Sequence, residues 1–184
     1  VETLNGQIDA AVPDDWWQVT LLDALNTSSS SAPAFVAYIA ALNILDAEVL
    51  LATSKVKDWI NARPTVKGIE KHHLFPRDYL KAVVGISDNK KINQVANLAL
   101  VEWSDNITIS NQAPTEYWPQ EVAEKNLEEV RRVQQEEWHA LPKRWIELDY
   151  DRFLVARRGL MARVIHEGFK RLTDPNYEPD LTRP

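Results

Sequence analysis

The chain contains no cysteine among its 184 residues. It therefore has no disulfide, no thiolate zinc site and no cysteine nucleophile, and this composition fits the reducing cytoplasm, where we expect the protein to be located. Its N-terminal segment lacks the charged and apolar regions of a signal peptide, and no run of about 18 apolar residues occurs. We therefore expect neither export nor a membrane.

Three phosphate- or ester-related motifs are also missing. The sequence has no GxxxxGK[ST], GxGxxG or GxSxG pattern. It therefore lacks the motifs of P-loop nucleotide-binding proteins, of dinucleotide-binding domains and of hydrolases with a nucleophile elbow. The net charge of −6 argues mildly against nucleic acid as a partner. The charge is unevenly distributed, however, because residues 131–171 hold ten Lys or Arg against six acidic residues. A local basic face is thus compatible with the acidic average.

The remaining composition is that of an ordinary globular domain. The chain is 45% hydrophobic and has seven tryptophans, enough for a sizeable core. We expect one compact domain, which we divide into an N-terminal helical part (1–64), a core (65–119), a C-terminal helical part (120–174) and a flexible tail (175–184). Because the chain begins at Val1 rather than methionine, we expect it to be the C-terminal part of a longer protein.

Hydrophobic periodicity predicts an α+β, mainly helical fold. Strands are predicted in VKGIEKHHL and NLALVEW, and a turn in SDNKK between them. Apolar spacing, caps and prolines predict the helices, which lie in segments 14–25, 33–45, 54–60, 76–84, 121–141 and 149–172.

One short stretch, KHHLFP, draws attention because His72 and His73 are adjacent in a chain with four histidines. Neighbouring imidazoles disfavour each other's protonated form, which suits a site that uses a metal ion or transfers a proton. Successive strand residues point to opposite faces, but at a twisted strand end the two rings can converge. The alternative is that His72 and His73 only stabilise the fold and take no part in any chemistry. The other two histidines, His139 and His166, are expected at the surface or its boundary.

Downstream of the pair lie three asparagines, Asn97, Asn106 and Asn111. The combination of HHLFP, NLALVEW and a later asparagine resembles the HNH, or His-Me finger, endonucleases, whose ββα core binds one divalent metal. The match runs from Gly68 to Pro114. More particularly, TSSSSAPAFVAYIAALNIL, KHHLFPRDYL and DYDRFLVARRGLM resemble the C-terminal nuclease half of GmrSD-type restriction proteins.

This resemblance implies a role for each matching residue. His73 would be the general base that activates water, and His72 and Asn106 would be the protein ligands of one Mg²⁺ or Mn²⁺ ion. Asn97 would pin the loop that holds His73 and help to fix its tautomer. Asn111 would support the following helix or touch the scissile phosphate.

The sequence departs from the family at two points. No Lys or Arg directly follows Asn106, so the phosphate contacts are assigned to Arg77 and Lys81, with Lys90 or the later arginines as alternatives. The paired CxxC motifs that stabilise many small HNH domains are absent, and we expect the flanking helices to replace them by burying apolar surface.

The resemblance also implies a function and partners. We expect a divalent-metal-dependent DNA endonuclease with little sequence specificity, belonging to an anti-phage restriction system. A ParB-like nucleotide-hydrolysing domain, upstream in the same protein, would sense modified phage DNA, and SspE-like relatives would link nicking to phosphorothioate marks. The alternatives are a catalytically idle module that binds nucleic acid or protein, and a toxin-like RNase.

Overall fold

The structure is a computed structural model, and it describes residues 12–13, 15–60, 68–104, 109 and 111–176. Its elements are, in chain order, η1 (Trp16–Thr20), α2 (Leu21–Ala24), α3 (Pro33–Ile44), α4 (Val56–Ile60), β1 (Ile69–His73), α5 (Arg77–Ala82), α6 (Asn89–Ile92), η2 (Val95–Asn97), β2 (Leu98–Glu102), α8 (Pro114–Lys125), α9 (Glu129–Trp138), η3 (Trp145–Glu147) and α10 (Tyr150–Thr173). The prediction of an α+β, mainly helical fold is confirmed.

Strands β1 and β2 form a two-stranded antiparallel sheet in which Ile69 pairs with Glu102 and His73 with Leu98. The His pair thus lies at the end of β1, next to the start of β2. Directly after β2, Trp103 and Ser104 are helical. Asn106, the expected ligand on the helix of a ββα core, lies outside the described residues, so the ββα assignment stays a prediction.

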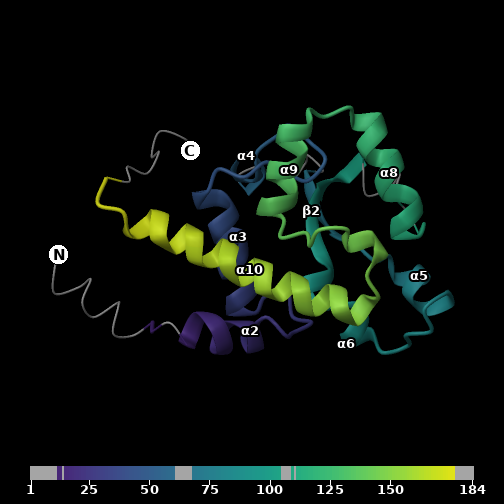
Figure 1. Ribbon diagram of the computed structural model, residues 1–184, viewed down its shortest axis with the longest axis horizontal. Coiled ribbons are helices and arrows are strands. Elements are labelled where there is room, and N and C mark those ends of the chain that lie inside the picture. The colour runs from purple at the N-terminus through teal and green to yellow at the C-terminus, as the bar shows by residue number, and fades with distance from the viewer. Residues whose placement is uncertain (1–11, 14, 61–67, 105–108, 110, 177–184) are drawn as a thin grey trace.

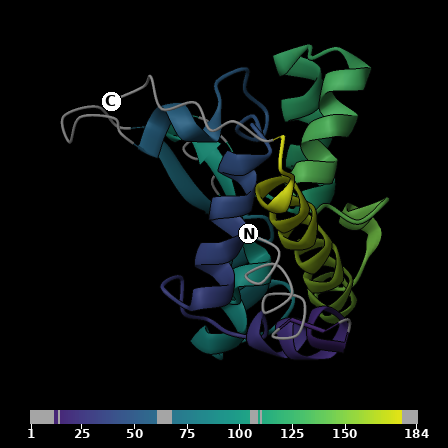
Figure 2. The same ribbon diagram turned by 90° about the vertical axis from the view of Figure 1, so that its left-hand side faces the viewer.

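The long helix α10 packs along α3, and the two lie side by side in both views (Figures 1 and 2). Gly168 makes this approach possible, because a Cβ atom placed there would lie 2.7 Å from the Ala41 Cβ. The helix is long enough to connect several regions: in Figure 1, α6 lies beside its N-terminal end, α2 lies below its middle, and β2 passes behind it. It also contacts η2, which leads directly into β2.

An aromatic cluster fastens the segment after the His pair to this helix. The Phe75 ring centroid lies 4.8 Å from that of Phe153, 5.3 Å from that of Tyr150 and 5.9 Å from that of Trp145. Phe75 is buried, as are its three partners. Aromatic pairs at these separations contribute beyond their buried area, so the strand end has little freedom to move relative to α10.

Some predicted elements differ from the structure. The single helix predicted over residues 121–141 is wrong: α8 ends at Lys125, its C-cap Asn126 has a left-handed backbone with φ of 46°, and α9 begins at Glu129. Pro114 at the first turn of α8 starts this helix earlier than predicted. The turn predicted in SDNKK is the short helix α6, whose N-cap Asp88 accepts a hydrogen bond from the Lys90 N–H.

The prediction that His139 lies at the surface or its boundary is also wrong, because the side chain is fully buried. Its Nε2 lies 2.8 Å from the carbonyl oxygen of Glu48, which satisfies one ring nitrogen in the core. Burial lowers the pKa of His139 to about 4, and the nearby Arg157 charge acts in the same direction.

Among the residues that the structure describes, no helix has the length and apolar character to cross a membrane.

Candidate functional site

A surface pocket of about 400 Å³ opens at the end of β1. Its lining includes five of the residues selected from the sequence, together with Pro76 and Asp78; the five are His72, His73, Arg77, Lys81 and Asn111. These residues come from the strand end, from α5 and from the segment before α8. The fold therefore brings the histidine pair and the proposed phosphate-binding cations to one solvent-accessible place.

The two histidines have different surroundings although both line the pocket. His72 pairs with Ala99 in the sheet, is 4% exposed, and meets the Tyr117 ring edge to face at 5.9 Å between centroids. His73 is half-buried, and its Nε2 lies 3.0 Å from the Asn93 Oδ1. One ring is thus enclosed by the core, whereas the other has an acceptor beside it at the pocket.

Burial lowers the pKa of His73 below its ordinary value. The hydrogen bond with Asn93 opposes this shift, and the positive charge of Arg77 adds to it. A lowered pKa keeps the imidazole neutral at neutral pH. A neutral ring has one nitrogen lone pair free to accept a proton, as a general base requires.

Asn97 holds the segment that follows His73. Its side-chain Oδ1 accepts the Phe75 N–H at 2.9 Å, and its Nδ2 donates to the Phe75 carbonyl at 3.0 Å and to the Ile92 carbonyl at 3.1 Å. The Leu74 N–H donates to the Asn97 carbonyl at 2.9 Å. These bonds are compatible with the expected pinning role. The side chain at hydrogen-bond distance from the His73 ring is that of Asn93, at 3.0 Å.

Tyr117 of α8 adds a second restraint on the same segment. Its hydroxyl donates to the Leu74 carbonyl at 2.7 Å, and burial raises the pKa of Tyr117 well above its ordinary value. The hydroxyl therefore stays protonated at neutral pH and keeps its hydrogen to donate. Asn97 and Tyr117 together leave the backbone after His73 with few unmet hydrogen-bonding groups.

A deeper support comes from Arg157 of α10, which is fully buried. Its guanidinium donates to the carbonyls of Ala96 at 2.9 Å and Leu98 at 2.8 Å, on either side of Asn97, and to the His139 carbonyl at 3.1 Å. Burial lowers its pKa. Five donors in a planar fork suit this multiple carbonyl contact, which lysine could not reproduce.

On α5, Arg77 and Lys81 are four residues apart, so their side chains lie on the same face of the helix. Both are exposed and both line the pocket. Asp78 lines it as well, and sequence reasoning did not select it. Asn111 is exposed, lines the pocket and precedes α8 in the chain. Two cations beside a histidine pair can contact an anion such as a phosphate group.

A metal ion at this site has one expected ligand within the described residues, the His72 imidazole. The second, Asn106, falls outside them. In the part of the chain that the structure describes, no group of three or more His, Cys, Asp or Glu side chains could hold a metal ion. The expected ligands are only two, one imidazole and one amide oxygen, so they would not form a group of that kind. Two protein ligands would leave the other coordination positions of the ion open for water and substrate.

Besides Asp78, sequence reasoning missed Asn93 and Tyr117, which shape the site from its surroundings. Asn93 lies in NKKINQ, where no hydrophobic period marks a position. The signal that was available is the Asp88 N-cap, which places a short helix over the following residues and Asn93 at its end. Tyr117 reads as one more aromatic of the core, and its hydroxyl contact depends on how α8 packs.

Comparison of the chain with protein-family models, with curated proteins and with solved structures found no match. The pocket and its surroundings therefore carry the functional conclusion.

Proposed function

We propose that this protein is a divalent-metal-dependent DNA endonuclease that hydrolyses phosphodiester bonds with little sequence specificity. The observation that carries the proposal is the pocket at the end of β1. It gathers a half-buried neutral histidine, a second histidine and two cations that lie on one helical face. Phosphodiester hydrolysis needs a base, charge neutralisation and contacts to the phosphate, and these residue types can supply all three.

In this proposal His73 accepts the proton of the attacking water through its free ring nitrogen. Arg77 and Lys81 hold the phosphate oxygens by charge-assisted hydrogen bonds. His72 and Asn106 hold one Mg²⁺ or Mn²⁺ ion, which would neutralise charge on the phosphate and on the departing oxygen. Asn97 keeps the His73 backbone in place through the bonds of its side chain to Phe75 and of its carbonyl to the Leu74 N–H.

The resemblance to GmrSD-type proteins supports a setting for this chemistry. We propose that the chain acts in defence against phage in the cytoplasm, and that an upstream ParB-like domain of the same protein senses modified DNA. The pocket itself offers few amide or apolar groups that could read base edges, since its lining is dominated by histidines and charged residues. Recognition of the DNA would thus come from the partner domain.

A supercoiled plasmid tests the proposal. We expect relaxation of the plasmid only when Mg²⁺ or Mn²⁺ is present, and a rate at least roughly 100-fold lower in His73→Ala, because a general base commonly contributes that much. His166→Ala is the matched control. This half-buried histidine stacks on Trp17 with ring centroids 4.3 Å apart and does not line the pocket, so the variant should cut like the wild type.

Two further outcomes separate the alternatives. Asn106→Ala should weaken the dependence on metal while leaving DNA binding nearly intact. If the wild type binds DNA, never cleaves it, and loses binding equally in the His73 and Asn106 variants, the protein is a binding module. Preferential degradation of RNA under the same conditions would identify a ribonuclease.

A further inference from the structure

The short helix α6 ends at Asn93, whose side chain reaches the candidate base. The Asn93 Oδ1 and the His73 Nε2 are 3.0 Å apart. An amide oxygen has no hydrogen to donate, so this contact requires the hydrogen of a neutral imidazole to be on Nε2. The other nitrogen, Nδ1, then carries the lone pair that can accept a proton. The contact thus selects one of the two tautomers of His73.

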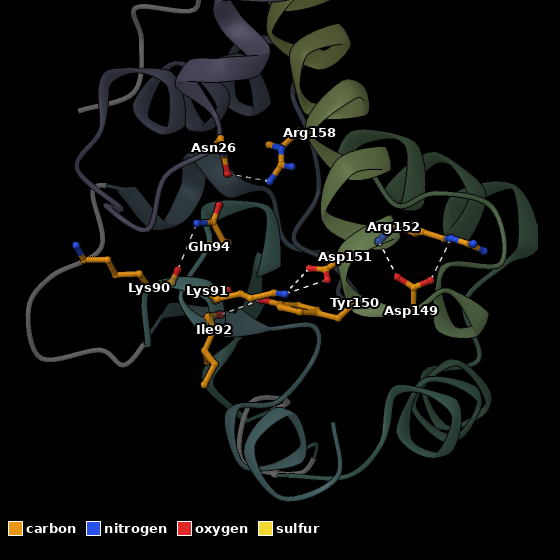
Figure 3. A network of polar contacts seen from close by, with 10 residues as sticks. All are labelled: Asn26, Lys90, Lys91, Ile92, Gln94, Asp149, Tyr150, Asp151, Arg152 and Arg158. Carbon is orange, nitrogen blue, oxygen red and sulfur yellow. Dashed lines mark hydrogen bonds and ion pairs between the residues drawn. The ribbon is translucent and has the colours of Figure 1, made fainter. Parts of the chain in front are cut away.

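The position of Asn93 is itself set from outside the pocket. The Tyr150 hydroxyl of α10 donates to the Lys91 carbonyl at 2.9 Å, and the Asn97 Nδ2 donates to the Ile92 carbonyl at 3.1 Å. Lys91 Nζ also lies 2.8 Å from the Asp151 carboxylate. Figure 3 shows the two contacts that come from α10, the Tyr150 hydroxyl bond and the Lys91–Asp151 ion pair. The helix that carries Asn93 is therefore fastened at two successive carbonyls.

We propose that Asn93 is a positioning residue for His73, which fixes the orientation of its ring and keeps its hydrogen on Nε2. This inference rests on the proposed function for its catalytic meaning, because there His73 acts as the base through Nδ1. The same His–acceptor arrangement is what makes one nitrogen of a functional histidine consistently available for chemistry. Asn93 itself does not line the pocket.

Gln94 provides a matched comparison on the same helix end. Its Nε2 donates to the Lys90 carbonyl at 3.3 Å, and its side chain lines a separate pocket of about 280 Å³ beside Asn26 and Arg158. Both Asn93 and Gln94 are partly buried amide side chains. A purely structural role for this segment should make substitution of either residue equally harmful, whereas the positioning role concerns Asn93 alone.

The tautomer can be measured without any nuclease activity. Long-range ¹H–¹⁵N NMR spectra of the whole metal-free chain at pH 8 distinguish protonated from unprotonated ring nitrogens, and His73→Gln assigns the His73 signals. We expect hydrogen on Nε2 in the wild type and a mixture of both tautomers in Asn93→Ala. Hydrogen on Nδ1 in the wild type, or an unchanged spectrum in Asn93→Ala, would overturn the inference.

Kinetics on plasmid DNA then test the consequence for the reaction. Asn93→Ala should lower kcat by roughly 10- to 100-fold, as loss of an outer partner of a functional histidine commonly does, with little change in KM. Asn93→Asp keeps an oxygen acceptor and should recover most of the rate, and Gln94→Ala should resemble the wild type. Equal losses in Asn93→Ala and Gln94→Ala, or a change confined to KM, would refute the positioning role.

Failure of the inference differs from failure of the proposed function. A wild type that cuts no nucleic acid, although its His73 tautomer depends on Asn93, sinks the nuclease and keeps the positioning contact. A wild type that cuts DNA, but whose His73 tautomer does not depend on Asn93, supports the nuclease and refutes the positioning role.

Discussion

His139 should make the folded protein lose stability in mild acid. Its ring is fully buried, and its Nε2 donates to the Glu48 carbonyl, an acceptor that fixes the neutral tautomer. The guanidinium of Arg157 binds the backbone carbonyl of the same histidine, at 3.2 Å from Nε and 3.1 Å from Nη2, so a second positive charge there is disfavoured. Burial and this charge bring the pKa of His139 to about 4, from an ordinary value of 6.5.

The direction in which the stability changes with pH depends on whether the folded or the unfolded chain binds the proton more tightly. Because the pKa is lower in the folded state, the unfolded chain binds the proton first as the pH falls below 6.5. The stabilisation is complete above pH 6.5 and is lost progressively down to about pH 4. The shift of 6.5 − 4 = 2.5 corresponds to about 3 kcal/mol in all, at about 1.4 kcal/mol for each pKa unit. Most of this, about 2 kcal/mol, should be lost between pH 7 and pH 5.

His139→Gln is the perturbation that isolates the effect, because glutamine can still donate to the Glu48 carbonyl but does not titrate. We would measure the free energy of unfolding in urea at pH 8, 7, 6 and 5 for both proteins. The wild type minus the variant should be constant between pH 8 and pH 7 and fall by about 2 kcal/mol by pH 5. Other titrating groups cancel in this difference. A flat difference would refute the reasoning, since it would mean that His139 can be protonated inside the folded protein.

Four other substitutions probe the packing and the site. Gly168→Ala should destabilise the protein by about 1–2 kcal/mol in urea unfolding, because the new Cβ overlaps the α3 backbone, whereas Gly159→Ala meets no atom within 4 Å and should stabilise α10 by about 0.5–1 kcal/mol. Asn97→Ala should cost about 3 kcal/mol by leaving buried backbone groups unpaired. Arg77→Ala should raise the KM for DNA about fivefold, with exposed Arg163→Ala as the neutral control.

The sequence predicted those elements whose pattern is local. Strands β1 and β2 are short runs with clear ends, α3 is a long apolar segment, and α10 is long enough for its apolar spacing to be decisive. The break between α8 and α9 was missed because Asn126 reads as a tolerable helix residue. Its left-handed φ of 46° depends on where the two helices pack.

Apolar residues do not mark the buried face of α9. Val130 is 82% exposed and Val133 is 42% exposed, whereas Gln135 is 1% exposed. The Gln135 side chain accepts the Leu51 N–H at 3.0 Å and donates to the Ala52 carbonyl, and Leu51 has a left-handed backbone with φ of 65°. The helix is thus oriented by the hydrogen-bonding needs of a strained loop, which no count of apolar residues reveals.

At the candidate site, some residues could be predicted from the sequence and others only from the structure. The residues with recognisable chemistry were found from the sequence, and the pocket gathers His72, His73, Arg77, Lys81 and Asn111. Residues that act through another residue were not found, because their importance depends on a contact across the fold. A half-buried asparagine in a polar segment has no signature until the structure places it 3.0 Å from an imidazole.

The C-terminal helix has a place in the site although none of its residues lines the pocket around His73. Arg157 binds the carbonyls on both sides of Asn97, and the Asn97 side chain binds Phe75, two residues after His73. Placing a guanidinium in the core is costly, and an apolar residue could fill its volume more cheaply. What an apolar residue could not do is hold two carbonyls at a fixed separation around Asn97. We infer that the buried charge is kept because it transmits the rigidity of α10 to the strand end where His73 lies.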